Sequence, residues 1–365
     1  MEMYSVIVLF VPISFAFKFV CNANICWLSH YNPNKDGTFM FKYVQENMSL
    51  NIQDLDSSEI SYVLLDRIPG TELVVAHSPD VKRLHISRNN RMISLTIMET
   101  GIISVECDLN ENLRELIITS SPLATISASI INLKNLENLT IQSCLIRQLD
   151  LGVFCDLKSL NFLSLSKNKI QSIVSRVKSS PCRLTMTIII LRGNEIRVLN
   201  LELFNRCYKL KRLEFQSNQI ELVTGRFANK AIESIDLNKN RINQLNLCQW
   251  DTPSLEELKL DMNSLLAVPA CVDKIKSLEI INMSYNNLTH INYSWLESLK
   301  NLKILDIHMN NIDSVTLDSF PKNLGNTGLT GSASKSEDYS NVAGSKLCVK
   351  LESNVCSCLN ASELA

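Results

Sequence analysis

The chain has 365 residues, with 36 Lys and Arg against 37 Asp and Glu, so its formal net charge is −1 at pH 7. This mixture of acids and bases argues against a nucleic-acid-binding surface and against a polybasic patch for membrane surfaces. Glycine is scarce, and neither G-x-G-x-x-G nor a Walker loop is present, which disfavours the nucleotide-binding folds.

An apolar run from Val6 to Phe17 opens the chain, and the small-residue stretch Cys21-Asn22-Ala23 follows it. This arrangement is typical of a secretory signal peptide, so we predict that residues 1–23 are removed by a cut after Ala23. The alternative is a short anchor or a buried element, although the run is too short to span a bilayer comfortably. No later stretch reaches about 18 apolar residues, so we expect a secreted, extracellular protein without stable membrane insertion.

Residues 24–80 contain Cys26, several aromatic residues and a turn at Asn32-Pro33, and they do not follow the periodic pattern found farther along the chain. That pattern predicts stacked strands, and the first strand of a stack is an open edge that needs a cover. We therefore predict an N-terminal cap of strands over 24–80. The segment that follows is irregular, because two repeat-like beginnings, Val81 and Met92, lie only 11 residues apart.

From Met92 to Val315 the chain repeats the pattern L-x-x-L-x-L-x-x-N-x-L-x-x-L, with other apolar residues in some Leu positions. Successive copies begin between 21 residues apart (Met92 to Leu113) and 26 residues apart (Leu160 to Met186). The Asn position is filled by asparagine in seven copies, at Asn168, Asn194, Asn218, Asn240, Asn263, Asn286 and Asn310. Upstream copies carry another small residue there, namely Thr100, Ser121 and Cys144.

This pattern identifies the chain as similar to the extracellular leucine-rich repeat proteins. The resemblance implies an α/β-type solenoid, a leucine-rich repeat horseshoe with a parallel β-sheet on its concave face and irregular or short-helix return segments. The physical reason is that one copy cannot bury its apolar side alone, so neighbouring copies stack and share one core. We predict about ten repeats over 81–322.

The repeated asparagine has a structural explanation. The chain turns at that position inside the core, and the backbone groups exposed by the turn need hydrogen-bond partners. An amide side chain both donates and accepts, so a column of asparagines can tie each turn to the next. We therefore predict that the seven asparagines form a structural ladder.

Other asparagines begin N-x-S/T motifs, which in a secreted chain are candidate glycosylation sites. They are Asn47, Asn138, Asn282, Asn287, Asn292 and Asn360. Asn138 and Asn282 fall on predicted strands and face the concave side, where a glycan would cover part of the sheet.

The predicted strands place alternate side chains on the concave face, because neighbouring residues of a strand point to opposite sides. From Met186 onward this face is mixed in charge and is the candidate binding surface. It contains Arg192, Arg212, Glu214, Gln216, Asp236, Lys239, Lys259, Asp261, Tyr285, Asp306 and His308. Tyr285 is the candidate anchor, since Tyr is favoured at interface hot spots; the alternative is a surface tyrosine without a partner.

Twelve cysteines indicate an oxidising compartment, and loss of Cys21 with the signal peptide would leave an odd number. Cys248 and Cys271 occupy the same position of consecutive repeats, so stacking would place them side by side, as a disulfide or as two buried thiols. Cys155 and Cys182 lie near repeat boundaries and could either pair or pack.

The pattern stops after Val315, and the residues that follow are poor in core positions. Residues 323–346 are rich in Gly, Ser and Thr and predict a flexible linker. A cysteine-containing C-terminal tail, 347–365, comes next. Its cysteines are candidates for interchain disulfides, with a metal site as the alternative, although no zinc-type spacing is present. They are Cys348, Cys356 and Cys358.

No catalytic spacing stands out. None of the five histidines forms H-x-x-x-H or H-E-x-x-H, and no G-x-S-x-G occurs. Asp236 and Asp261, on neighbouring strands beside Lys239 and Lys259, are explained as charges on a solvated face. Catalysis also needs a pocket that excludes water, which an open curved sheet does not obviously provide. We predict a protein that is not an enzyme, with no cofactor, no catalytic residue and no metal site.

The segment LNLCQWDTPSLEELKLDMNSLLAVPAC resembles the return segments of mosquito leucine-rich immune proteins, through Cys248, Trp250, Val268, Pro269 and Cys271. The resemblance implies a secreted recognition protein of innate immunity. It also implies disulfide-linked pairs and binding of complement-like thioester proteins. The longer members of that family carry a C-terminal coiled coil, whereas this sequence shows no heptad stretch.

The predicted function is therefore that of a secreted protein-binding module, in innate immunity through binding of a pathogen or a complement-like protein. Its partner is a protein of unknown identity, with a disulfide-linked homo- or heterodimer as one arrangement, and no nucleic acid. The alternatives are a receptor ectodomain fragment, since Toll-like receptor ectodomains share the repeat, and a cell-adhesion or matrix-type repeat protein. An intracellular adaptor is a third reading, which occupied glycans would eliminate.

Overall fold

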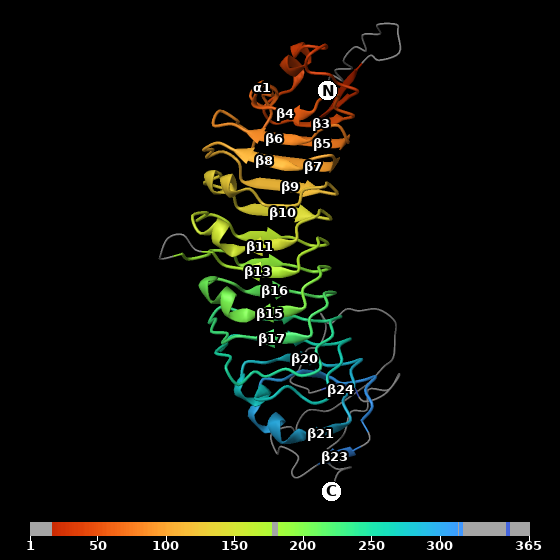
Figure 1. The fold of residues 1–365 in the computed structure, drawn as a ribbon, viewed down its shortest axis with the longest axis vertical. Helices are drawn as coiled ribbons and strands as arrows, with labels where there is room; N and C mark the ends of the chain where they lie inside the picture. The colour runs from red at the N-terminus through yellow and green to blue at the C-terminus, as the bar shows by residue number, and fades with distance from the viewer. Residues whose placement is uncertain (1–16, 177–181, 313, 317–347, 351–365) are drawn as a thin grey trace. The chain divides into compact units, whose positions relative to one another are not determined.

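The computed structural model describes residues 17–176, 182–312, 314–316 and 348–350. The chain divides into two compact units, Met1–Met186 and Thr187–Ala365. Both are built from the same coil, which has one strand in a main sheet, a turn, and a return segment that leads to the next strand (Figure 1). Among the described residues, no helix is long and apolar enough to cross a membrane.

In the first unit the strands of the main sheet follow one another in chain order. They are β1 (Lys18–Asn22), β2 (Ile25–Ser29), β3 (Ser49–Gln53), β5 (Glu72–Ser78), β7 (Ser94–Thr100), β9 (Glu115–Thr119), β10 (Asn138–Gln142) and β12 (Phe162–Ser164). β1 is antiparallel to β2, whereas each later strand pairs in parallel with the one before it. Figure 1 shows them as a ladder coloured from red to yellow-green.

The return segments of this unit form short strands and helical turns. β4 (Glu59–Ile60), β6 (Arg83–Ile86) and β8 (Ser104–Cys107) make a second parallel sheet, and β11 (Gln148–Asp150) pairs with β13 (Ser172–Val174). The helical turns are η1 (Phe39–Tyr43), α1 (Tyr62–Leu65), η2 (Ala128–Asn132) and η3 (Leu151–Phe154).

Within residues 24–80 the strands of the predicted cap join the main sheet in the same way as the strands of the repeats. β2, β3 and β5 lie in register, with Ile25 beside Ser49 and Ser49 beside Glu72. The irregularity after residue 80 is also explained, because each coil here has two strands: β6 belongs to the second sheet and β7 to the main sheet. We therefore place the beginning of the solenoid well before residue 81.

The second unit repeats the arrangement with shorter strands. Its main sheet contains β14 (Ile188–Ile190), β16 (Arg212–Glu214), β18 (Ser234–Asp236), β19 (Glu257–Lys259), β20 (Ile280–Asn282), β22 (Ile304–Asp306) and β24 (Cys348–Lys350). Return strands β15 (Val198–Asn200) and β17 (Leu222–Thr224) pair, as do β21 (His290–Asn292) and β23 (Ser314–Thr316). The helical turns are η4 (Leu201–Arg206), η5 (Val272–Lys274) and η6 (Tyr293–Ser298).

The core follows from the alternation along each strand. Leu213, Ile235 and Leu258, the middle residues of β16, β18 and β19, are fully buried, whereas the residues on either side of them are not. Burial of a Leu or Ile side chain contributes about 1.5–3 kcal/mol, so the stack of coils is held mainly by these columns. Aromatic pairs fill the wider part of the coil, as where the rings of Phe204 and Phe215 meet edge to face at 5.7 Å.

A left-handed residue follows the main strand in the coils of both units. Lys167, Lys239 and Tyr285 have φ of 54°, 53° and 53°, a conformation that side chains other than glycine seldom adopt. Each stands directly before a ladder asparagine in sequence. The turn therefore directs the next side chain, that of the asparagine, into the core.

The predicted linker, 323–346, lies outside the described residues, as do Cys356, Cys358 and Asn360 of the predicted tail. Cys348 begins β24, which pairs in parallel with β22. Residues 1–16 are also outside the described part, but Cys21 is inside it and forms a disulfide with Cys26. In the structure Cys21 is thus part of the fold, whereas the predicted cut after Ala23 would remove it.

Candidate protein-binding face

The ladder asparagines connect neighbouring coils through their side chains. The Nδ2 group of Asn286 donates to the carbonyl oxygen of Leu260 in the preceding coil at 2.9 Å and to that of Met283 in its own coil at 3.0 Å. Its Oδ1 accepts from the amide of Leu265 at 2.9 Å. The same donation to the preceding coil is made by Asn168, Asn218, Asn240, Asn263 and Asn310, and Asn194 donates to Leu191 of its own coil.

Other residues fill this position farther upstream. Thr100 and Ser121 bond to each other through their hydroxyl groups at 2.9 Å, and the Cys144 thiol points to the Gln142 carbonyl oxygen at 3.3 Å. Ser78 accepts from the amide of Leu55 at 2.9 Å, a ladder position that sequence reasoning missed. The signal was present, because Ser78 lies 22 residues before Thr100.

With the ladder inside the core, the sheet face that points away from the core carries the functional candidates. We define the open face of the second unit as the side chains of β16, β18, β19, β20 and β22 that point away from the core. It also includes the side chain two positions after the end of each of these strands. Register places Glu214, Asp236, Lys259, Asn282 and Asp306 side by side in one row. Arg212 lies in the row before them, and Gln216, Asp261 and His308 lie beyond the strand ends. Arg192 belongs to the coil of β14 and is exposed.

Ion pairs hold part of this face. Lys259 Nζ lies 2.9 Å from a carboxylate oxygen of Glu257 on its own strand, and Arg212 lies 3.9 Å from Glu214. Although burial alone would raise it, the pKa of Glu257 is lowered, because Lys259 and the Ser234 hydroxyl donate hydrogen bonds to its carboxylate. Sequence reasoning missed Glu257, which occupies the same repeat position as Arg212.

Asp236 has an environment that disfavours its charge. Burial is the largest cause and raises the pKa of its carboxyl from 3.8 to about 6, with Asp261 and Glu214 adding to the increase. The amide of Asn238, a hydrogen-bond donor at 3.0 Å, and the charge of Lys259 act in the opposite direction. Burial likewise raises the pKa of Asp261. The nearby cations therefore do not fully offset the cost of burying the charges of these two carboxylates.

The described side chains of the open face therefore have an acidic excess. The acids are Glu214, Asp236, Glu257, Asp261 and Asp306, and the bases of the same set are Arg212 and Lys259. Lys239 stands at the turn and is exposed. His308 hydrogen-bonds to the Asp306 carboxylate through Nδ1.

An exposed apolar ridge borders the acidic row. Met262, Tyr285 and Met309 occupy the left-handed turn position of three consecutive coils and are 45%, 47% and 48% exposed. The amides of Met262 and Tyr285 donate to the carbonyl oxygens of Ser284 and His308 at 2.9 Å and 3.0 Å. The Tyr285 ring also meets the His308 ring edge to face at 4.9 Å. Sequence reasoning named Tyr285 and missed the two methionines, although all three immediately precede a ladder asparagine.

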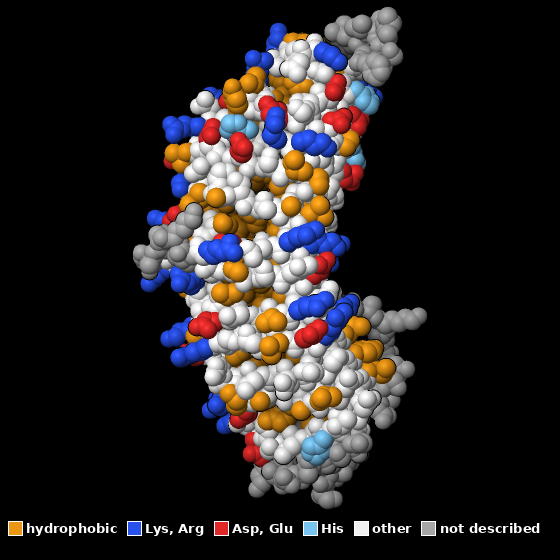
Figure 2. All heavy atoms as spheres, in the orientation of Figure 1, with side chains coloured by type: hydrophobic (Ala, Val, Ile, Leu, Met, Phe, Trp, Pro, Cys, Tyr) orange, Lys and Arg blue, Asp and Glu red, His pale blue; other side chains and the backbone are white. Residues whose placement is uncertain are grey.

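The sheet face of the first unit differs in chemistry. Its central row is uncharged and consists of Trp27, Asn51, Val74, Thr96, Ile117 and Thr140. Acidic and basic side chains elsewhere are interspersed over the visible face in Figure 2 and do not gather into a block of one sign. The charged row of the second unit is therefore chemically distinct from the uncharged row of the first.

The candidate glycan sites differ in access. Asn47, Asn287 and Asn292 are exposed, and the Asn292 side chain accepts from the amide of Ser294 at the start of η6. Asn138 and Asn282 are half-buried on β10 and β20, with Asn282 Oδ1 accepting from the amide of Ser284 at 3.0 Å.

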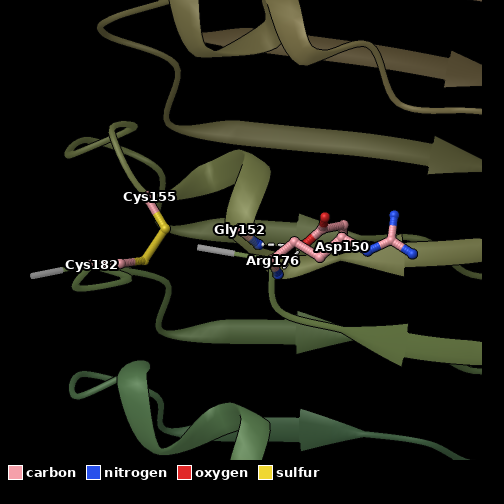
Figure 3. The surroundings of a disulfide bond; sticks show 5 residues. All are labelled: Asp150, Gly152, Cys155, Arg176 and Cys182. Atoms are coloured by element: carbon pink, nitrogen blue, oxygen red, sulfur yellow. Dashed lines mark hydrogen bonds between the residues drawn. A yellow bond between two sulfur atoms is a disulfide. The ribbon is translucent and has the colours of Figure 1, made fainter. Parts of the chain in front are cut away.

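Cysteines strengthen the return segments. Cys248 and Cys271 form a disulfide between consecutive coils, with Cα atoms 5.0 Å apart. Burial raises the pKa of the Cys207 thiol to about 12, in keeping with a core role for this residue. The structure also settles the open question of Cys155 and Cys182, which are disulfide-bonded (Figure 3).

The Cys155–Cys182 bond lies beside a close approach of two coils. Asp150 Oδ1 accepts from the amides of Gly152 and Arg176, both at 2.9 Å (Figure 3). A Cβ on Gly152 would lie 2.4 Å from the Arg176 carbonyl oxygen, so only glycine fits there. Within the described part of the chain, no group of three or more His, Cys, Asp or Glu side chains could hold a metal ion.

Comparison with known proteins agrees with this architecture. The family profile for the leucine rich repeat matches residues 111–170 and 253–312. Toll-like receptor 2 of Macaca mulatta is 28% identical over 183 residues, which is 42% of this chain and 22% of the receptor. The volume-regulated anion channel subunit LRRC8B of Mus musculus is 25% identical over 248 residues, 65% of this chain and 29% of the subunit. The chain thus spans less than a third of the length of these curated relatives.

The fold is shared with a solved structure. A chain from the octameric complex of Latrophilin 3, Unc5D and FLRT2 has a TM-score of 0.50 and 20% identity, and the match covers 63% of this chain and 76% of that chain. The leucine-rich repeat domain of APL1B, a mosquito immune protein, has a TM-score of 0.47 and 16% identity over 72% of this chain and 68% of that chain. The repeating coil, the asparagine ladder and the matched profile together show a leucine-rich repeat solenoid.

Proposed function

We propose that this chain is a protein-binding module and that its docking surface is the open face of the second unit together with the apolar ridge. The proposed partner is a protein segment that presents a lysine or arginine next to an apolar side chain. The observation that carries the proposal is the acidic excess of the open face in coils whose turns expose the apolar side chains of the ridge. The raised pKa of Asp236, a half-buried carboxylate of this face, supports it.

The electrostatic argument concerns Asp236 and Asp261. Both carboxylates have already lost part of their hydration, so a cation from a partner would gain attraction at little further desolvation cost to them. The same cation would favour the ionised form of Asp236. Binding should therefore weaken as the pH falls below about 6, where Asp236 takes up a proton.

The apolar argument concerns Met262, Tyr285 and Met309. Their side chains are about half exposed, and hydrogen bonds to the next coil hold the backbone amides of Met262 and Tyr285. Methionine adapts its shape to an apolar partner, and tyrosine is enriched at interface hot spots. A hot-spot side chain contributes about 2 kcal/mol or more, which corresponds to a loss of affinity of about thirtyfold on truncation.

A selection from a random peptide display library tests this proposal. Peptides that bind the intact wild-type chain should be enriched in Lys or Arg beside an apolar residue, and Asp236→Asn or Tyr285→Ala should weaken them at least tenfold. Asp251→Asn and Tyr208→Ala are matched controls, because both residues are exposed and lie outside the open face. Enrichment of acidic peptides, or equal losses in the controls, would exclude the proposed face.

For the setting we propose a secreted recognition protein of innate immunity. Support comes from the apolar N-terminal run, the disulfides of both units and the likeness to Toll-like receptor 2. The second candidate is a part of a receptor ectodomain, favoured by the 28% identity to Toll-like receptor 2 over 183 residues. Secretion from insect cells with glycans removable by a glycosidase is expected for both candidates, and an unglycosylated intracellular product would exclude both.

We further propose a covalent pair as one form of the secreted protein. Of the twelve cysteines, six are in the three disulfides of the described part and three are buried thiols there, which leaves three in the tail. An odd number of tail cysteines leaves one for a second chain. A band of twice the mass that disappears on reduction is expected, and a Cys348→Ser/Cys356→Ser/Cys358→Ser variant tests whether the tail carries the bond.

A further inference from the structure

The first strand of the solenoid lies upstream of the cut that the sequence pattern indicates. β1 pairs with β2 along its whole length, from Lys18 opposite Ser29 to Asn22 opposite Ile25. Ala23 lies in the tight turn between the two strands, with φ of 48°. A cut after Ala23 would therefore remove one strand of a formed hairpin.

A disulfide and a buried cluster give this hairpin a structural role. Cys21 is bonded to Cys26, and Cys26 is fully buried. Loss of Cys21 would leave Cys26 as a buried thiol without its partner. It would also turn β2 into the edge of the main sheet and leave its unpaired backbone groups open to another chain.

Phe17 belongs to the same structure. Its ring meets the rings of Tyr31 and Phe39 edge to face, with centroids 6.4 Å and 5.9 Å apart. Tyr31 is fully buried, its hydroxyl donates to the Gly37 carbonyl oxygen at 2.8 Å, and its ring also meets that of Phe41. The aromatic cluster over the first coil thus begins at Phe17.

The sequence offers a second processing site that spares these contacts. Signal peptides end in small residues at the third and first positions before the cut, after an apolar stretch of about 7–15 residues. Ser14 and Ala16 meet that requirement for the bond between Ala16 and Phe17, and the apolar stretch from Val6 precedes them. Cys21 and Ala23 meet it for the bond after Ala23, so the pattern alone admits both sites.

We infer that the secretory signal peptidase hydrolyses the peptide bond between Ala16 and Phe17, so that the mature chain begins at Phe17 and keeps Cys21. Water adds across the bond, which gives a carboxylate on Ala16 and an α-amino group on Phe17. This inference rests on the secretion proposed above. The inferred cut replaces the one predicted after Ala23. Because Cys21 is retained, Cys26 keeps its disulfide partner, and the cysteine without an intrachain partner lies in the tail.

N-terminal sequencing and intact mass of the glycan-free protein secreted by insect cells test the inference. Phe17 is expected as the first residue. Ala16→Trp should block this cut, whereas Ala23→Trp should leave the first residue unchanged. Asn24 as the first residue, an uncleaved N-terminus, or a shift of the cut in the Ala23 variant would overturn the inference.

Peptide mapping without reductant provides a test that does not depend on the variants folding. Trypsin should release the peptide Phe19–Lys35 from the wild-type protein with Cys21 and Cys26 resistant to alkylation, and both cysteines should react after reduction. Absence of this peptide would overturn the inference. A protein that is secreted but begins elsewhere defeats only the processing site, whereas a protein that is not secreted also defeats the proposed extracellular function.

Discussion

Replacement of Asn286 by alanine tests whether the ladder stabilises the stack of coils. The Asn286 side chain is only 5% exposed and bonds the carbonyl oxygen of Leu260 and the amide of Leu265, both in the preceding coil. Asn286→Ala removes the amide but no large apolar group, and it leaves both neighbouring N-x-S/T motifs intact. Its effect is therefore a measure of the hydrogen bonds between coils.

The magnitude follows from the groups left without a partner. A buried donor or acceptor that loses its hydrogen bond costs about 1–3 kcal/mol. Two such groups belong to the preceding coil, so the free energy of unfolding should fall by about 2–6 kcal/mol. A water molecule that enters the space would keep the loss near the lower figure.

Guanidinium unfolding followed by circular dichroism measures this loss, and hydrogen exchange at the amide of Leu265 locates it. Asn243→Ala is the matched control, because the same atoms are removed from an exposed asparagine of the same unit. The control should change the free energy of unfolding by no more than about 0.5 kcal/mol. If Asn286→Ala were equally mild and the Leu265 amide kept its protection, the ladder would not hold the coils together.

Three further substitutions should each change the stability of the fold in a direction that the structure predicts. Lys167→Gly should raise the free energy of unfolding by about 1 kcal/mol, since Lys167 has a φ of 54°, whereas Lys158→Gly should not raise it; denaturant unfolding compares the two. Gly152→Ala should lower the melting temperature, because the new Cβ would lie 2.4 Å from the Arg176 carbonyl oxygen; an unchanged melting temperature would mean that the coils can separate there without cost. Asp236→Asn should stabilise the fold by about 3 kcal/mol at pH 7.5, because the folded pKa of about 6 exceeds the unfolded value of 3.8. As the pH falls through 6, Asp236 takes up a proton and the stability difference between the wild type and the variant shrinks. It should vanish below about pH 4, where the melting curves of the two proteins should coincide.

Much of the solenoid can be predicted from local pattern, since the requirement that one coil stack on the next recurs at every copy. The spacing of the leucines and asparagines identifies the strands of the main sheet from β7 to β22 and the residues that the core buries. The shared position of Cys248 and Cys271 predicts their proximity for the same reason. In these cases a residue's neighbour is its equivalent one repeat away.

Tertiary structure decides what depends on residues that are not equivalent. Residues 24–80 form coils although the leucine and asparagine pattern is weak there, because β2, β3 and β5 are aligned by pairing with strands of the next coils. The Cys155–Cys182 bond joins unequal repeat positions, so no periodicity indicates it.

The candidate site depends on the fold for the same reason. Sequence predicts that Asp236 and Tyr285 point outward, because a strand alternates its side chains and a turn exposes them. The raised pKa of Asp236 arises from burial beside Glu214 and Asp261, residues of its own coil's two neighbours. The ridge joins Tyr285 to methionines of the adjacent coils. The sequence by itself determines the repeat and the direction of each side chain, whereas desolvation and charge at a surface come from the side chains that the fold brings next to it.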